Sequence, residues 1–261
     1  MQLKTEKHLA TRTDIRDPLA DVVVSLAKTV SAPSPAKTVR WASHPLAAAL
    51  KNAGTQHIYT DTADKTELDD LLVTEESDKH IAFVEEIDGN TTNQVLVDKV
   101  LNNYFGENDA SSITEWVTQL KNAQPSLLLA EIVPLLYTVI NGQLGRQLKA
   151  YYGAGRNNGR QWEISLELHT ALAKDAAASK RIGSYLAKMV PRSFVKVALT
   201  PHEPHALLIA RDLERQGISV NFTTTFSARQ VAAVALLANT TRTNIFWKRI
   251  TPAIWEFRKR S

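Results

Sequence analysis

From residue 57 onward, short runs of apolar and β-branched residues alternate with longer stretches in which apolar residues recur at helical spacing. The pattern predicts six strands, at 57–62, 81–87, 162–168, 194–199, 218–223 and 242–246. It predicts helices after the first five strands, at 65–73, 94–104, 171–189, 203–216 and 228–238, and extra helices at 112–122 and 126–151. Repeated β-α alternation indicates an α/β fold with a parallel sheet, either doubly wound or closed into a barrel.

The chain before residue 57 has a different pattern. Residues 14–30 predict a helix with Pro18 near its first turn, where a missing N–H costs nothing. A Pro/Ser-rich linker follows, and a second short helix is predicted before Gly54. The chain therefore divides into N-terminal helices and a linker at 1–56, an α/β domain at 57–250 and a basic tail at 251–261.

Glycine placement separates the two α/β architectures. A dinucleotide-binding sheet carries a glycine-rich turn directly after a strand. The only glycine cluster here, Gly153-Ala-Gly-Arg-Asn-Asn-Gly159, precedes a predicted strand. The sequence therefore favours a TIM (β/α)₈-type barrel over a doubly wound sheet.

Composition narrows the chemistry. The absence of cysteine excludes a disulfide framework, a thiolate zinc site, an iron–sulfur cluster and a cysteine nucleophile. The most apolar stretch, 127–140, is interrupted by Glu131 and Pro134, so no membrane span is expected. We find no signal-peptide pattern at the N-terminus and predict a cytoplasmic protein.

Charge and histidine content suggest neither a nucleic-acid partner nor a metal. The net charge is +4, and the last fourteen residues alone contribute +4, so the rest of the chain is neutral overall. Nucleic-acid binding usually needs a clustered basic surface on the domain itself. His202-Glu-Pro-His205 lacks the spacing of a helical zinc motif and a nearby third ligand, so no metal is predicted.

Polar residues occur where a buried strand should be apolar. Lys196 lies between Val195 and Val197 in the fourth predicted strand. A central parallel strand is normally almost continuously apolar. This lysine therefore either protects an edge strand from aggregation or faces the barrel interior and has a function.

Other strands repeat the feature close to their carboxyl ends. The residues are Asp61, Glu167, Asn221 and Thr223. Capping of the following helix explains an isolated case, but several together match the placement of catalytic groups in barrel enzymes. Burial favours the neutral amine of a lysine, which can attack a carbonyl and form a Schiff base. A carboxylate that cycles between acid and base then supplies the proton transfers at the adjacent carbon–carbon bond.

Six segments resemble the motifs of the transaldolase family, in the family's order and with similar spacing. They are Tyr59-Thr-Asp-Thr-Ala63, Gly89-Asn-Thr-Thr-Asn93, Ser165-Leu-Glu-Leu168, Val195-Lys-Val-Ala-Leu-Thr200, Gly217-Ile-Ser-Val-Asn-Phe-Thr-Thr-Thr-Phe-Ser227 and Asn244-Ile-Phe-Trp-Lys-Arg249. The resemblance implies that Lys196 is the nucleophile, Asp61 and Glu167 are catalytic carboxylates, and Thr223 holds the catalytic water. It implies substrate binding by Thr91, Asn93, Asn221, Asn244, Phe246 and Arg249.

The reaction implied by the resemblance transfers a dihydroxyacetone unit between sugar phosphates, in carbohydrate metabolism such as the pentose phosphate pathway. The donor would be fructose 6-phosphate or sedoheptulose 7-phosphate and the acceptor an aldose phosphate. The reaction uses no metal or organic cofactor. Two alternatives from the same resemblance are a fructose-6-phosphate aldolase-type lyase and a non-catalytic transaldolase-like protein.

The sequence departs from the family pattern near its end. Asn244 replaces a serine, and Trp247 and Lys248 replace a pair of small residues. Only six of the eight barrel strands are predicted, and a second phosphate-binding arginine has no counterpart. We therefore expect an incomplete barrel, either a truncated or split gene product or a chain that closes by forming a homo-oligomer.

Overall fold

A computed structural model describes residues 17–30, 35–98, 110–156, 161–200, 205–225, 227–237 and 243–245. Its strands are β1 (Thr38–Ala42), β2 (Tyr59–Thr60), β3 (Val73–Glu76), β4 (His80–Val84), β5 (Gly89–Thr91), β6 (Glu163–Glu167), β7 (Phe194–Ala198), β8 (Ser219–Thr223) and β9 (Thr243–Ile245). Its helices are α1 (Pro18–Lys28), α2 (Pro45–Asn52), α3 (Lys65–Leu72), α5 (Ala110–Ala123), α6 (Leu129–Gly153), the 3-10 helix η1 (Thr170–Leu172), α7 (Ala176–Met189), α8 (His205–Arg215) and α9 (Ala228–Leu237). A further helical stretch covers 94–98.

Six strands form the main sheet in the order β2-β5-β6-β7-β8-β9, and each pair is parallel. The spatial order follows the chain without a reversal. A doubly wound sheet would contain a switch point where the order reverses. Among the described residues β2 and β9 do not pair, so the sheet is open there and no closed barrel is formed.

The prediction that the strand at 81–87 belongs to the main parallel sheet is wrong. The apolar residues of β4 are indeed buried, but β4 is the central strand of a separate three-stranded sheet with the order β1-β4-β3. The main sheet instead uses β5, whose residues Gly89, Asn90 and Thr91 are small or polar and yet buried. A search for apolar runs therefore finds β4 and misses β5.

Most predicted helices are present with small shifts at their ends. The prediction for 14–30 corresponds to α1, where Pro18 is the first helical residue and the Asp17 carboxylate accepts hydrogen bonds from the backbone of Leu19 and Ala20. The predicted helix at 171–189 is instead divided into η1 and α7, and Asp175 caps the second piece. The strands β1 and β3 were not predicted.

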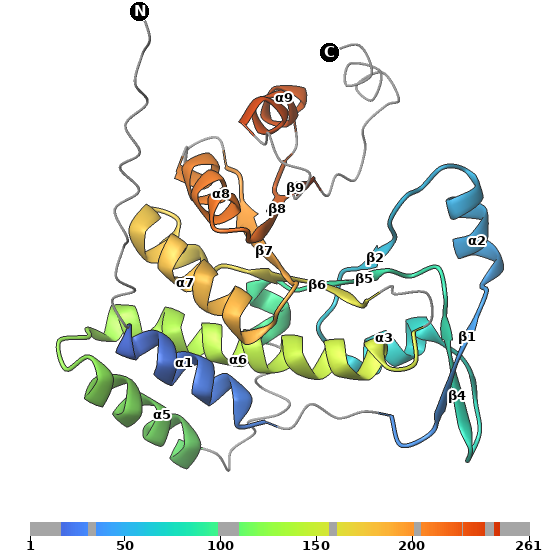
Figure 1. The fold of residues 1–261 in the computed structure, drawn as a ribbon, viewed down its shortest axis with the longest axis horizontal. Helices are drawn as coiled ribbons and strands as arrows, with labels where there is room; N and C mark the ends of the chain where they lie inside the picture. The colour runs from blue at the N-terminus through green and yellow to red at the C-terminus, as the bar shows by residue number, and fades with distance from the viewer. Residues whose placement is uncertain are drawn as a thin grey trace, which may run out of the picture.

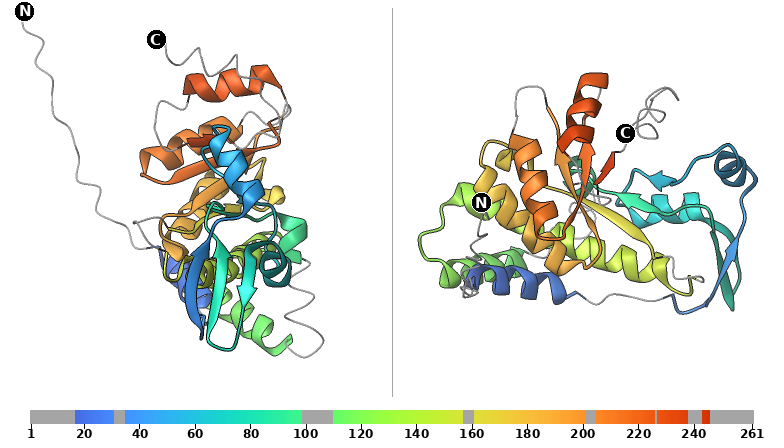
Figure 2. Two further views of the ribbon diagram at one scale, coloured as in Figure 1. Left: turned by 90° about the vertical axis from the view of Figure 1, so that its right-hand side faces the viewer. Right: turned by 45° about the horizontal axis from the view of Figure 1, so that its top comes forward.

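Helices cover the main sheet in two groups (Figure 1). Helix α1 packs against α5, α6 and α7, and α6 in turn packs against β6. In the second group, α7 packs against β7, α8 packs against β7 and β8, and α9 contacts α8 (Figure 2). Within the described part of the chain, no helix has both the length and the apolar character needed to cross a bilayer.

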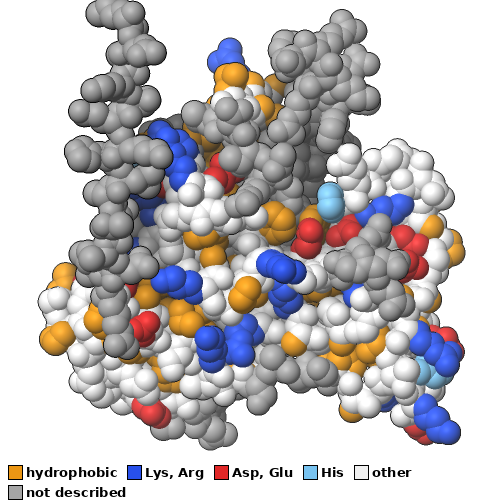
Figure 3. Space-filling view, in the orientation of Figure 1, with side chains coloured by type: hydrophobic (Ala, Val, Ile, Leu, Met, Phe, Trp, Pro, Cys, Tyr) orange, Lys and Arg blue, Asp and Glu red, His pale blue; other side chains and the backbone are white. Residues whose placement is uncertain are grey.

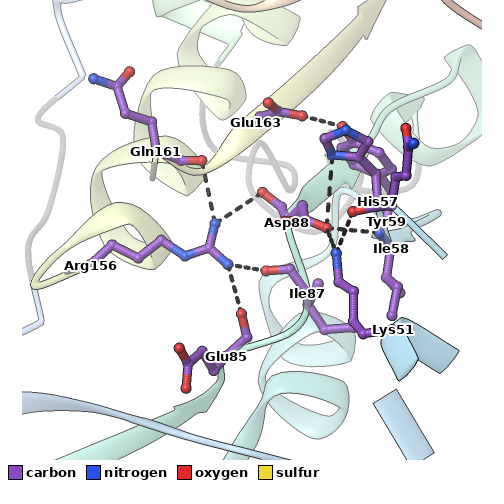
Figure 4. A network of polar contacts seen from close by, with 11 residues as sticks. Lys51, His57, Ile58, Tyr59, Glu85, Ile87, Asp88, Arg156, Gln161 and Glu163 are labelled. Atoms are coloured by element: carbon purple, nitrogen blue, oxygen red, sulfur yellow. Dashed lines mark hydrogen bonds and ion pairs between the residues drawn. The ribbon is translucent and has the colours of Figure 1, made fainter. Parts of the chain in front are cut away.

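Arg156 joins the small sheet to the amino ends of the main strands (Figure 4). Its guanidinium donates to backbone carbonyls of Glu85, Ile87, Asp88 and Gln161. It also lies over the rings of Trp41 and Trp162, at 4.8 and 5.6 Å from their centroids.

Asp88 completes this network from the other side. Its carboxylate accepts from Lys51 Nζ at 2.6 Å and from the Ile58 backbone at 2.9 Å. These contacts fix the beginnings of β2, β5 and β6, which lie at the opposite end of the strands from the predicted catalytic residues.

Candidate active site

Four polar residues lie side by side across the adjacent strands β6, β7, β8 and β9. The register pairs Glu167 with Lys196, Lys196 with Asn221, and Asn221 with Asn244. Directly paired residues of neighbouring strands project from the same face of a sheet, since side chains alternate along each strand. These four positions therefore share one face, at one level of the sheet.

The same face carries further polar positions one step away. Ser165 pairs with Thr91 across β5 and β6, two residues before Glu167, and Thr223 lies two residues after Asn221. The intervening positions Leu166 and Val195 face the other way and have no exposed surface. Among the sequence-predicted residues that lie on described strands, Thr91, Glu167, Lys196, Asn221 and Thr223 therefore share one face of the sheet, and Leu166 and Val195 belong to the other.

Lys196 lies in the interior of the sheet. Strand β7 is flanked by β6 and β8, which removes the edge-strand explanation of this lysine. The residue is 7% exposed, and its Nζ donates to the backbone carbonyl of Thr92 at 2.9 Å. A buried amine is thus held at the carboxyl end of β5 by a single described acceptor.

Glu167 lies beside this amine and is 8% exposed. Burial raises the pKa of its carboxyl group, and the charge of Asp61 raises it further. The charge of Lys196 and a backbone hydrogen bond from Gln94 act in the opposite direction. A carboxyl group with a raised pKa exchanges protons closer to neutral pH, as general acid–base catalysis requires.

Asp61 follows β2 directly and is exposed. Its Oδ1 accepts a hydrogen bond from Thr91 Oγ1 at 2.6 Å. Thr91 itself is 6% exposed, so a buried hydroxyl orients a carboxylate that remains open to solvent. The structure thereby brings two of the predicted residues together at the carboxyl ends of β2 and β5.

Asn221 has no exposed surface, and its Nδ2 donates to Ser165 Oγ at 2.7 Å. Its Oδ1 is buried without a hydrogen-bond partner among the described residues. Burying an amide oxygen without a hydrogen-bond donor is unfavourable for folding, and the hydroxyl group of a bound molecule would supply the missing donor. Thr223 is half-buried, and its backbone carbonyl accepts from Leu199 at 2.9 Å.

The remaining predicted residues are placed less completely. Asn93 is half-buried and its Oδ1 accepts from the Leu96 backbone at 2.9 Å, so this atom caps the helical stretch that begins at Gln94. Asn244 has its backbone in register with Asn221, but its side chain is not described. Phe246 and Arg249 lie outside the described residues.

Helix α6 contributes buried polar groups that strand patterns did not indicate. Asn141 has no exposed surface and contacts both Thr92 and the backbone of Glu167. One turn earlier, the hydroxyl of Tyr137 is buried without a hydrogen-bond partner in the described structure. Burial raises the pKa of Tyr137, and the charges of Glu167 and Asp98 raise it further. The sequence does contain one indication of these two groups, because Tyr137 and Asn141 are polar residues four positions apart in an otherwise apolar part of a helix.

Potential metal ligands are dispersed over the described part of the chain. No group of three or more potential ligands is found among the described residues, and His202 to Pro204 lie outside them. On the face drawn in Figure 3, Lys and Arg side chains are interspersed with acidic and apolar ones.

Comparison with known families agrees with this geometry. The family model for transaldolase/fructose-6-phosphate aldolase matches residues 58–258, which is most of the chain. The chain therefore belongs to the transaldolase/fructose-6-phosphate aldolase family. A comparison with curated proteins found no match.

Proposed function

We propose that this protein transfers a dihydroxyacetone unit between sugar phosphates through a Schiff base on Lys196. The observation that carries the proposal is the buried amine of Lys196 on a central parallel strand, in register with Glu167 and Asn221. A (β/α)-barrel enzyme carries its catalytic groups at the carboxyl ends of its strands. Membership of the family supports an aldolase or transaldolase type of chemistry.

In the proposed reaction, the neutral amine of Lys196 attacks the ketone carbon of the donor and forms a carbinolamine. Glu167 protonates the departing hydroxyl through a water molecule, for which Thr223 is the proposed holder, and water leaves as the iminium forms. Asp61 then takes the proton of the hydroxyl next to the scissile bond. The carbon–carbon bond breaks, and an aldose phosphate departs with its new carbonyl group. The electron pair of the broken bond moves into the iminium, so that the dihydroxyacetone unit remains bonded to Lys196 as an enamine.

The second half of the reaction reverses these steps with a different aldehyde. The enamine adds to the carbonyl carbon of an acceptor aldose phosphate, and Asp61 returns its proton to the new hydroxyl. Hydrolysis of the iminium then releases the product. Asn93, Asn221 and Asn244 are proposed to bind substrate hydroxyls, and Phe246 and Arg249 to line the phosphate end.

Borohydride reduction tests the Schiff base directly. Incubation with fructose 6-phosphate and borohydride should give a covalent adduct, detected by intact mass and located on Lys196 by peptide mapping. Lys196→Met should give no adduct, whereas Lys188→Met, which changes an exposed lysine of α7, should behave like the wild type. An unmodified wild-type mass under these conditions would support the non-catalytic alternative.

An acceptor assay separates the transferase from the lyase. With erythrose 4-phosphate present, a transferase produces sedoheptulose 7-phosphate and little free dihydroxyacetone. A fructose-6-phosphate aldolase-type lyase releases dihydroxyacetone at the same rate whether or not the acceptor is added. The unit proposed to carry the activity is the α/β domain at 57–250, in a cytoplasmic protein.

A further inference from the structure

Asn141 is an amide buried in the middle of helix α6. Its side chain has no exposed surface, and most of the helix around it is apolar. Burying an amide is unfavourable unless its hydrogen bonds are replaced, and here both ends are paired. Nδ2 donates to the backbone carbonyl of Glu167 at 3.0 Å, and Oδ1 accepts from Thr92 Oγ1 at 3.0 Å.

Thr92 connects this amide to the proposed nucleophile. The backbone carbonyl of Thr92 accepts the hydrogen bond from Lys196 Nζ at 2.9 Å. Its hydroxyl oxygen also accepts from the Glu167 backbone N–H at 3.3 Å. Asn141 therefore fixes two backbone segments at once, the one that holds the amine of Lys196 and the one that carries the carboxyl group of Glu167.

We propose that Asn141 is a positioning residue for the Schiff-base step. Together with the Thr92 hydroxyl it forms a latch, defined here as the hydrogen-bonded set of Asn141, Thr92 and the Glu167 backbone. The latch sets the distance between the amine and the carboxyl group before substrate binds. This inference rests on the proposed function, because it assigns a role in that same reaction.

A purely structural role is the competing explanation, and Gln143 provides the comparison. This second buried amide of α6 is 4% exposed and donates to the Leu26 carbonyl at 3.0 Å and to Thr29 Oγ1 at 3.4 Å. It ties α6 to α1, away from Lys196. Substitution of either amide by leucine removes a buried polar group from the same helix, but only one of the two contacts the site.

The test compares Asn141→Leu with Gln143→Leu in the full chain. Both variants should lose stability in urea. Only Asn141→Leu should slow borohydride trapping and kcat, by roughly tenfold to a hundredfold as expected for a misplaced catalytic group, with little change in KM. Thr92→Val should reproduce this loss and Thr92→Ser should not, since serine keeps the hydroxyl. The double variant Thr92→Val with Asn141→Leu should be no slower than the slower single variant, because both remove one unit.

Equal trapping rates in Asn141→Leu and wild type would overturn the proposal, as would an equal loss in Gln143→Leu. If Asn141→Leu does not fold, Thr92→Val, which has nearly the same shape, decides the question. Amide hydrogen exchange separates this inference from the proposed function. If the wild type forms no adduct, the proposed chemistry fails, but faster exchange at Thr92 and Glu167 in Asn141→Leu alone would still establish the latch. Unchanged exchange would refute it.

Discussion

Gly89 lies at a position where the neighbouring backbone leaves no room for a side chain. It begins β5, is buried, and pairs with Tyr59 of β2 and Glu163 of β6. A Cβ atom at this position would lie 1.9 Å from the Glu163 carbonyl oxygen and 2.7 Å from its carbonyl carbon. Both atoms belong to the backbone, so no side-chain rotation relieves the contact.

The magnitude follows from the displacement that Gly89→Ala requires. Ordinary contact begins at 3.4 Å, so β5 and β6 must separate by about 1.5 Å. Two hydrogen bonds that join these two segments of the chain would break or lengthen: Glu163 N to Asp88 O at 3.0 Å and Thr92 N to Ser165 O at 2.8 Å. With about 1 kcal/mol for each bond and about 1–3 kcal/mol of strain, the expected loss in unfolding free energy is about 3–5 kcal/mol.

Urea unfolding followed by tryptophan fluorescence measures this loss, with the slope m compared between variants to verify two-state behaviour. Gly153→Ala is the matched control, because its added Cβ would lie 3.5 Å from the Trp162 Cβ, an ordinary contact, at the end of helix α6. The control should be neutral or slightly stabilising. A Gly89→Ala protein within about 1 kcal/mol of wild type would refute the strand spacing on which this reasoning depends.

Two further predictions concern stability. Since burial raises the pKa of Glu167 in the folded state, its charge disfavours folding above that pKa, and this effect is absent below the ordinary value of 4.5. Glu167→Gln should therefore be more stable than wild type at pH 8, and the difference should disappear as the pH falls toward 4; a constant difference in urea midpoints would contradict this. Asp17→Ala removes the cap of α1 and the acceptor of the Tyr185 hydroxyl at 2.5 Å, so its unfolding free energy should fall by about 2 kcal/mol. Asp17→Asn keeps a side-chain oxygen that can cap the helix, so in the same assay its unfolding free energy should stay close to that of the wild type.

The order of the elements was predictable from residue 57 onward because amphipathic helices and apolar strands have different periods. The prediction failed at β5, where the strand consists of Gly89, Asn90 and Thr91. Asn90 is buried because its amide donates to the Thr62 carbonyl at 2.9 Å and its oxygen accepts from Trp162 Nε1 at 2.7 Å. A strand that satisfies polar side chains through contacts distant in sequence has no hydrophobic pattern to reveal it.

The candidate site was predictable to the extent that it lies on strands. Alternation along β6 and β8 separates Glu167 and Asn221 from their apolar neighbours, and the structure places both on the face of Lys196. Asn141 could not be found in this way. In a helix, one amide among apolar residues has the same appearance whether it meets a neighbouring helix, as Gln143 does, or the backbone of a site.

The distribution of polar groups explains why the strands and α6 must be considered together. Lys196 and Glu167 are both largely buried, and two ionisable groups in an interior are stable only where backbone dipoles and partners are fixed around them. Strand pairing fixes their register along the sheet, and the hydrogen bond from Thr92 N to the Ser165 carbonyl at 2.8 Å continues this pairing one residue past β5. On the role proposed for it, the side chain of Asn141 adds a second constraint from helix α6, through the Thr92 hydroxyl and the Glu167 backbone carbonyl. By the same proposal, a chain with the strand motifs alone would place Lys196 and Glu167 on one face without this second constraint on the distance between the amine and the carboxyl group.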